Sequence, residues 1–130
     1  MEISYVQNDK NLSADKFLEM VNNVWPGEYD LELTHEAIKN SINITAWDKE
    51  ALVGCVRVLT DGYFFGTITE ILVLPKYQNM GIGRELMRLA FDCSPTSLYF
   101  GAQPESEKFY EKLGYSKSLQ SYSRKKPRKK

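Results

Sequence analysis

The residues best suited to chemistry lie in the stretch 71–84, between a short apolar run and an amphipathic helix. The run 71–74 predicts a buried strand, and Pro75 ends it because proline has no N–H to continue a ladder. Gly81 and Gly83 follow a polar turn and open the helix. Bare backbone N–H groups and the positive end of the helix dipole attract anions there. Since glycine lets backbone approach phosphate oxygens closely, the stretch predicts a phosphate-binding loop.

Three kinds of phosphate loop can be compared with this stretch. A P-loop requires Gly-x-x-x-x-Gly-Lys-Ser/Thr, which residues 81–86 do not supply. A dinucleotide-binding loop requires a third glycine three residues after Gly83, where this chain has Leu86. The pattern Gln78-x-x-Gly81-x-Gly83, after a Val-x-Pro strand end, fits the third kind. It resembles the coenzyme A pyrophosphate loop of the GNAT superfamily of N-acetyltransferases.

A second motif further along the chain strengthens the resemblance. The segment 109–115 has the sequence Phe-Tyr-Glu-Lys-Leu-Gly-Tyr and is similar to the last helix of that superfamily. Glu70 stands three residues before Val73, where the superfamily often carries an acidic residue. The two motifs stand in the right order, separated by one helix and one strand. The resemblance covers about residues 68–115 and implies an acetyltransferase.

The resemblance also implies how acetyl-CoA would be held. Backbone N–H groups of the loop would bind the pyrophosphate, and the pantetheine arm would bond the main chain of the fourth strand as an added strand does. Arg84 would add charge to a phosphate, or it would instead pair with a neighbour in its own helix. The cofactor-binding residues implied in this way are Leu72, Val73, Leu74, Gln78, Asn79, Met80, Gly81, Ile82, Gly83 and Arg84.

Two side chains are candidates for the implied chemistry. Transfer of an acetyl group to an amine needs a base for the amine, a donor to the oxyanion and an acid for the leaving thiolate. Glu70, a carboxylate in a mostly apolar strand, is the candidate general base; the alternative is a structural ion pair with a lysine or with Arg57. Tyr110 is the candidate general acid; the alternative is a tyrosine that only packs in the core. The Val73 backbone N–H is the expected oxyanion donor.

An acidic and aromatic loop is expected to receive the acceptor. In the resembled fold the acceptor enters between the first two helices and the late strands. Carboxylates beside aromatic rings suit a cationic amine, through ion pairing and cation–π contact. The candidate residues are Trp25, Glu28, Tyr29 and Asp30, with Glu32 nearby. A small polyamine-like or arylalkylamine acceptor is expected, while a protein lysine or N-terminus, or a loop that is merely solvated, stays open.

Composition places the chain among soluble globular proteins, with 42% hydrophobic and 26% charged residues in 130. No apolar run approaches the ~20 residues that span a bilayer, and no secretory signal is visible, so we expect a cytoplasmic protein without a membrane segment. Two distant cysteines and one histidine argue against a zinc site, and no metal is expected. Cys55 and Cys93 are expected to be free thiols.

The order of the expected elements predicts an α/β fold. Strands are expected at 3–7, 44–48, 51–59, 64–74 and 97–100, with a two-residue turn at 61–62. Ser13 is expected to cap a helix at 14–24, and after a loop over 27–33 Thr34 is expected to cap a second helix that ends near residue 41. Two further helices are expected at 81–93 and 104–113. The resemblance implies a mixed, mostly antiparallel sheet, splayed between the fourth and fifth strands and flanked by about four helices. The superfamily usually ends in two more strands. Here a strand-like stretch at 118–125 leaves room for a short hairpin or a single strand.

Charge is unevenly distributed, although the formal net charge is zero. Six of the 17 positive charges fall within residues 124–130, which leaves 11 positive against 17 negative charges elsewhere. We therefore expect a single acetyltransferase domain over residues 1–123 and a basic C-terminal tail over 124–130. The tail would be solvated, or it would touch an acidic surface or nucleic acid. No basic stripe with interleaved aromatic residues supports nucleic-acid binding by the domain itself.

These expectations together describe an N-acetyltransferase. It would move an acetyl group from acetyl-CoA, as co-substrate, to a small-molecule or peptide amine by direct attack, as a monomer or a homodimer. The alternative is a non-catalytic module that binds acyl-CoA and has lost transfer. The presence of both Glu70 and Tyr110 favours the enzyme.

Overall fold

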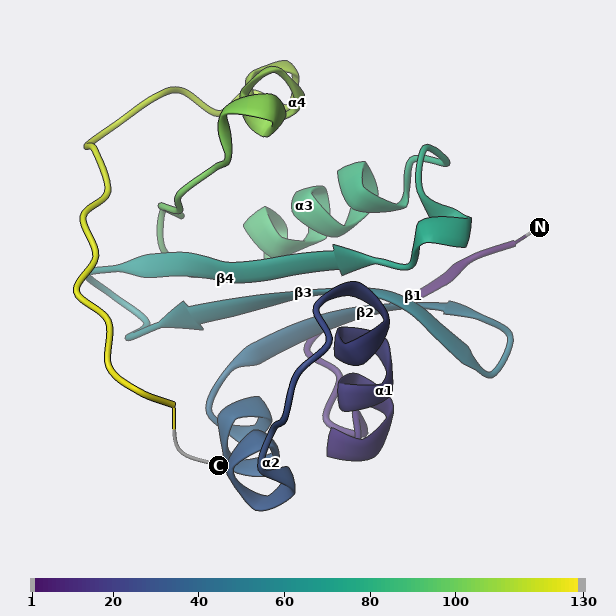
Figure 1. Cartoon of the computed structure of the whole chain (residues 1–130). Coiled ribbons are helices and arrows are strands. Elements are labelled where there is room, and N and C mark those ends of the chain that lie inside the picture. The colour runs from purple at the N-terminus through teal and green to yellow at the C-terminus, as the bar shows by residue number, and fades with distance from the viewer. Residues whose placement is uncertain (1, 129–130) are drawn as a thin grey trace.

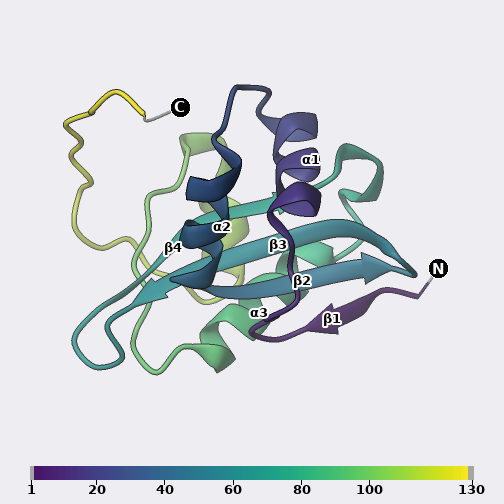
Figure 2. The same cartoon turned by 90° about the horizontal axis from the view of Figure 1, so that it is seen from below.

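The computed structural model describes residues 2–128, with an antiparallel sheet between two layers of helices (Figure 1). The strands, which neighbour one another in chain order, are β1 (Ser4–Val6), β2 (Ile42–Asp48), β3 (Ala51–Thr60) and β4 (Gly66–Val73). The helices are α1 (Ala14–Val24), α2 (Leu31–Lys39), α3 (Ile82–Cys93) and α4 (Glu107–Lys112), with short 3-10 turns η1 (Pro75–Tyr77) and η2 (Pro104–Ser106). α1 and α2 cover one face of the sheet and α3 covers the other (Figure 2), with α4 beyond α3 (Figure 1). The predicted α/β class and mostly antiparallel sheet are confirmed.

Apolar residues fill two core layers, one on each face of the sheet. Ile44, Val56 and Leu86 have no exposed side-chain surface and belong to the layer against α3. Phe17 and Cys55 belong to the layer against α1. Successive strand residues point to opposite faces, so β2 and β3 contribute to both layers, and this explains why β3 in particular is mostly apolar.

The first two helices begin at capping residues. Ser13 Oγ accepts from the Lys16 N–H at 3.1 Å, so the predicted cap of α1 is confirmed. α2 begins earlier than predicted, because Asp30 and not Thr34 is its cap. The Asp30 carboxylate accepts from the Leu33 N–H at 2.8 Å, whereas the Thr34 hydroxyl donates back to the Asp30 carbonyl at 2.7 Å. The loop that was predicted to run to residue 33 therefore ends at a fixed carboxylate.

The connection from β3 to β4 is a loop over residues 61–65, and the predicted two-residue turn is wrong. The Asp61 carboxylate accepts from the backbone N–H groups of Tyr63, Phe64 and Phe65, at 2.8 to 3.1 Å. These hydrogen bonds hold the pKa of Asp61 below its usual range. Because they curl the chain into the loop, β4 begins at Gly66 and not at residue 64.

β4 carries a bulge in its middle. Glu70 pairs with Arg57 of β3, and Ile68 pairs with the next residue, Val58, so Thr69 is an extra residue in the ladder. A bulge bends its strand and increases the local twist. It also places Thr69 and Glu70 together opposite Arg57, and this brings three polar side chains to one point of the sheet.

The predicted fifth strand at 97–100 is reduced to a single parallel bridge. The Tyr99 N–H donates to the Gly66 carbonyl at 3.0 Å, and the Ile68 N–H donates to the Tyr99 carbonyl at 3.3 Å. Pairing ends at Ile68, directly before the bulge, because the bend carries β4 away from its neighbour. Beyond this point the edge of β4 has no paired strand among residues 2–128, so the predicted splay lies there.

The strand predicted at 118–125 is wrong. Residues 116–128 are exposed throughout and contain no strand or helix. Every side chain of this segment is exposed, so the segment has no buried face to fix its register as a strand of the sheet. In Figure 1 it runs from α4 past the start of β4 and on toward α2. Lys129 and Lys130 of the predicted basic tail lie outside the described residues.

Two further sequence expectations can be compared with the described residues. Cys55, buried in β3, and Cys93, half-buried at the end of α3, are free thiols as predicted. None of the helices between residues 2 and 128 has the length and apolar character needed to cross a membrane.

Candidate active site

Glu70 forms a bidentate ion pair with Arg57 at the bulge. The Arg57 Nε and Nη2 atoms each donate to a Glu70 carboxylate oxygen at 2.8 Å, and Nε also donates to Thr69 Oγ1 at 3.0 Å. Both side chains are largely covered, with exposed fractions of 13% for Glu70 and 20% for Arg57. This is the ion pair that the sequence left open as an alternative. Its two parallel hydrogen bonds hold the carboxylate in one orientation.

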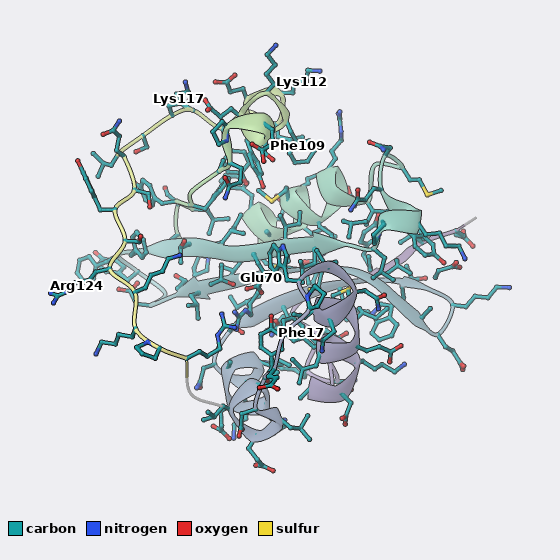
Figure 3. All side chains as sticks on the ribbon, in the orientation of Figure 1. Phe17, Glu70, Phe109, Lys112, Lys117 and Arg124 are labelled. Carbon is teal, nitrogen blue, oxygen red and sulfur yellow. The ribbon has the colours of Figure 1, made fainter. Side chains whose placement is uncertain are left out.

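A pocket of about 460 Å³ lies above this pair, between α1, α2 and strands β3 and β4. The Arg57 guanidinium lies 6.0 Å from the Phe17 ring centre, and Figure 3 shows Glu70 on the same side of the sheet as Phe17. The wall includes Trp25, Tyr29 and Asp30. Three of the four predicted acceptor residues thus share a pocket with the candidate base, whereas Glu28 does not line it.

One wall of the pocket comes from a distant part of the chain. Arg128 lines the pocket, and its guanidinium carbon lies 5.2 Å from the centre of the Tyr29 ring. No residue of the basic tail was predicted to lie at this pocket. The basic run carries no periodic pattern, and so no local signal indicates where it packs.

The loop between β4 and α3 has two residues in left-handed conformations. Asn79 has a φ of 64°, and Gly81, the N-cap of α3, has a φ of 84°. Among residues 2–128, no side chain caps the first N–H groups of α3, so these groups are available to a ligand. Of the other predicted loop residues, Met80 is exposed, while Ile82 is buried in the core and anchors the helix.

Arg84 lies exposed in the first turn of α3. Within residues 2–128 it forms no ion pair, and the pairs of this helix instead join Arg88 to Glu85 and Asp92, at 2.7 and 3.0 Å. The acidic neighbours in this helix, Glu85 and Asp92, therefore pair with Arg88 and not with Arg84. A cation in the first turn opposes the helix dipole, and a bound anion would offset that cost.

Gly83 is not required by the protein's own packing. A Cβ atom there would lie 3.7 Å from the Phe109 ring and 4.0 Å from Ile71, which are ordinary contacts. Gly83 lies within α3, and its φ is not among the positive values of the described glycines. The backbone of the loop thus requires glycine at Gly81, whereas neither the backbone nor the packing of the described residues requires it at Gly83.

The end of β4 presents its main chain to the open edge. The Leu74 N–H donates toward β3, to the Val53 carbonyl at 2.9 Å, so the Val73 carbonyl points the opposite way. There it accepts from Gln78 Nε2 at 3.0 Å, which ties the loop to the strand. In a strand the N–H and C=O of one residue point to the same side, so the Val73 N–H also faces the open edge. The buried Leu72 side chain packs in the α1 layer.

Tyr110 lies on the other face, in α4. Its ring is half-buried against Phe100, at 4.8 Å between ring centres, and packs with the layer that includes Ile71 and Val73. Burial raises the pKa of the Tyr110 hydroxyl, so this group stays protonated at neutral pH and can donate a proton. Glu70 and Tyr110 therefore face opposite sides of the sheet, with the open edge of β4 between them.

Tyr115 is a second phenol in this layer. Its ring centre lies 6.3 Å from that of Tyr110, and its buried hydroxyl has no hydrogen-bond partner among the described residues. Burial, with a smaller contribution from Tyr110, raises the pKa of Tyr115. The motif at 109–115 contains Tyr115 but carries no signal for its hydroxyl, because only tertiary packing leaves that group without a partner among residues 2–128.

The arrangement suits group transfer between an anionic donor and an amine. A helix start with free N–H groups leads to an open strand edge, with a carboxylate pocket on one face and a phenol on the other. Within residues 2–128, no three His, Cys, Asp or Glu side chains gather where they could hold a metal ion.

Comparison with known protein families identifies the class. Residues 39–117 match the family model described as the acetyltransferase (GNAT) domain, which is more than half of the chain. The chain belongs to this family, and the resemblance inferred from the sequence motifs is confirmed.

Individual relatives support the same assignment. The chain is 27% identical over 122 residues to the uncharacterized N-acetyltransferase ycf52 of Pyropia yezoensis, covering 87% of this chain and 70% of that protein. A GNAT-family acetyltransferase of Streptococcus pneumoniae superposes with a TM-score of 0.74 at 23% identity, covering 95% of this chain and 100% of that one. Aminoglycoside N-acetyltransferase AAC(6')-Iy, solved with the bisubstrate analogue CoA-S-monomethyl-acetylneamine, has a TM-score of 0.75 at 17% identity, covering 98% and 99%. At these identities the solved structures show a shared fold.

Proposed function

We propose that this protein is an acetyl-CoA-dependent N-acetyltransferase that acts on a primary amine. The observation that carries the proposal is the position of Glu70. It lies at the floor of an acidic and aromatic pocket, on the same strand whose open edge leads to the Gly81–Gly83 loop. One strand thus links a place for the amine to a place for the acyl donor.

The donor would bind at the loop and along β4. The uncapped N–H groups of α3 and the Arg84 guanidinium suit a pyrophosphate, and Gly83 leaves space for its oxygens. The open edge at Val73 can accept a pantetheine arm in the manner of an added strand. AAC(6')-Iy, with the same fold, was solved with a coenzyme A analogue, and this supports a similar donor here.

In the proposed reaction, Glu70 takes a proton from the amine, directly or through one water, while Arg57 holds the carboxylate in place. The amine nitrogen forms a bond to the acetyl carbon, and the Val73 N–H donates to the resulting oxyanion. The carbon–sulfur bond then breaks, and Tyr110 protonates the leaving thiolate. The products are an N-acetyl amide and free coenzyme A.

The acceptor is proposed to carry a positive charge close to the reacting amine or on it. Glu70 shares its negative charge with Arg57. Asp30 supplies further negative charge, and Trp25 and Tyr29 supply aromatic faces to the pocket wall. An ammonium group gains from both. A pocket of about 460 Å³ suits a small molecule or a single side chain of a peptide.

The proposal is tested by incubating the protein with acetyl-CoA and a panel of polyamines, arylalkylamines, amino acids and lysine peptides. Acetylated product is detected by mass spectrometry, which also identifies the amine that carries the acetyl group. Amine-dependent product is expected. Tight acetyl-CoA binding with no product from any amine would instead favour the non-catalytic module, in which the Arg57–Glu70 pair is only structural.

A further inference from the structure

The proposed acceptor pocket already holds a cation of the chain itself. The Arg128 guanidinium lies 5.2 Å from the centre of the Tyr29 ring and lines the same pocket as Glu70 and Asp30. An aromatic face and nearby carboxylates are the features that the pocket would offer to a cationic amine. Arg128 therefore lies where the charged group of an acceptor would bind.

The segment that carries Arg128 is held by few contacts. Of the described residues, 116–128 are all exposed, and none forms a backbone hydrogen bond with the rest of the chain. Lys117 forms an ion pair with Glu107 at 2.9 Å, near the start of the segment. Between residues 2 and 128, no ion pair joins Arg128 to a carboxylate, so the cation–π contact with the Tyr29 ring holds its guanidinium in place. A segment held in this way can leave the pocket at small cost.

We infer that residues 118–128 act as a tethered competitor of the amine acceptor, with Arg128 in the place of the acceptor's cationic group. This inference rests on the proposed function, since it concerns the same pocket. Two cations cannot both contact the same face of Tyr29, so an acceptor must displace Arg128 before it binds. Because the tether keeps Arg128 at a high effective concentration, even a weak contact reduces the apparent affinity for the acceptor.

The test compares Arg128→Ala with Arg124→Ala in the full chain. Both variants remove one exposed positive charge from the same segment, but Figure 3 shows Arg124 far from Glu70 and Phe17. With the amine that gives product, Arg128→Ala should lower the KM for that amine about two- to fivefold, the effect of one exposed cation–π contact. The KM for acetyl-CoA should not change, and Arg124→Ala should change neither value.

A second measurement does not depend on activity. The aromatic NMR signals of Tyr29 and Trp25 are followed in the three proteins during titration with methylguanidinium. Arg128→Ala should shift the Tyr29 ring signals before any addition and should bind methylguanidinium about two- to fivefold more tightly. Arg124→Ala should match the original chain in both respects.

The outcomes separate the two proposals. If no amine is acetylated but these NMR differences appear, the proposed function fails, and only the occupation of the cation site by Arg128 stands. If transfer occurs while all three proteins share the same KM and the same Tyr29 signals, the competitor role is overturned. It is also overturned if Arg128→Ala weakens acceptor binding, because Arg128 would then be part of the binding wall.

Discussion

Arg57 and Glu70 are joined across the bulge of β4 by two hydrogen bonds of 2.8 Å. Both side chains are largely covered, so neither charge could remain there alone without a large desolvation cost. The pair can be purely structural, or it can hold the carboxylate in position as a base. These roles make different predictions.

We expect Glu70→Gln to lower kcat by about 100-fold or more if the carboxylate is the general base. Arg57→Met should lower the free energy of unfolding by about 3 kcal/mol, because it leaves Glu70 mostly buried without its partner. The double variant should recover much of that stability but not the turnover. Denaturant unfolding and steady-state kinetics on all four proteins check this, and recovered turnover in the double variant would leave Glu70 with a structural role only.

Tyr110→Phe should lower kcat by about 100-fold while acetyl-CoA affinity stays nearly unchanged, because the lost hydroxyl acts on the leaving thiolate. Since burial raises the Tyr110 pKa, the hydroxyl stays protonated as pH rises. The wild-type rate should therefore persist to about pH 10, the usual tyrosine pKa, and fall only above it. A pH–rate profile and calorimetric binding of acetyl-CoA measure both effects.

Tyr115→Phe is the matched control in the same aromatic cluster. It removes a buried hydroxyl that has no hydrogen-bond partner among residues 2–128, so the protein should gain about 1 kcal/mol of stability. Turnover should change far less than in Tyr110→Phe. Equal losses of turnover in both variants would indicate a packing effect and would remove the acid role from Tyr110.

Gly83→Ala should weaken acetyl-CoA binding without destabilising the fold. The new methyl group meets only ordinary contacts in the protein, and alanine is favoured over glycine in a helix by about 1 kcal/mol. The melting temperature should therefore stay level or rise, whereas the Kd for acetyl-CoA should increase at least several-fold. An unchanged Kd would place the pyrophosphate elsewhere.

Asp30 has two roles that substitution can separate. Asp30→Asn keeps the cap of α2, since asparagine also accepts from the Leu33 N–H, but removes the charge from the pocket. It should raise the KM for a cationic amine with little change in stability. Asp30→Ala should in addition cost about 1 kcal/mol of stability through loss of the cap. If Asn leaves the KM unchanged, the charge of Asp30 does not contribute to acceptor binding.

The two cysteines should differ in reactivity. Burial, with Glu70 as a lesser cause, raises the pKa of Cys55 far above its usual value, and burial beside Asp92 raises the pKa of Cys93 less. Thiol reagents attack the thiolate, so at pH 8 Cys93 should react slowly and Cys55 only after unfolding. Mass spectrometry of alkylated peptides from folded and unfolded protein checks this order of reactivity.

The raised pKa values of the two thiols also mean that stability should decline as pH rises above about 8.5, where the unfolded chain loses its thiol protons more readily.

Local patterns predicted much of the fold and of the donor-binding loop. The Ser13 cap, the strand end at Pro75 and the spacing of Gly81 from Gly83 depend on neighbours in the chain, and the structure has these elements where they were expected. The start of α2 was wrong because Asp30 and Thr34 are both good caps, and only the backbone hydrogen bonds show which one acts. The turn at Asp61 was wrong for the same kind of reason, since one carboxylate binds three N–H groups in succession.

The sequence by itself determined the family, the position of the Gly81–Gly83 loop and the candidate pair of Glu70 and Tyr110, because these follow from residue types at short, fixed spacing. Only the tertiary structure decided that Glu70 pairs with Arg57, that Tyr110 lies on the opposite face and that Arg128 reaches Tyr29. Each of these is a contact between residues far apart in the chain. The contacts within the sheet depend on the register of β3 with β4, which the bulge shifts by one residue. The contact of Arg128 depends on the path of a C-terminal segment whose sequence has no periodic pattern. Neither leaves a local pattern in the sequence.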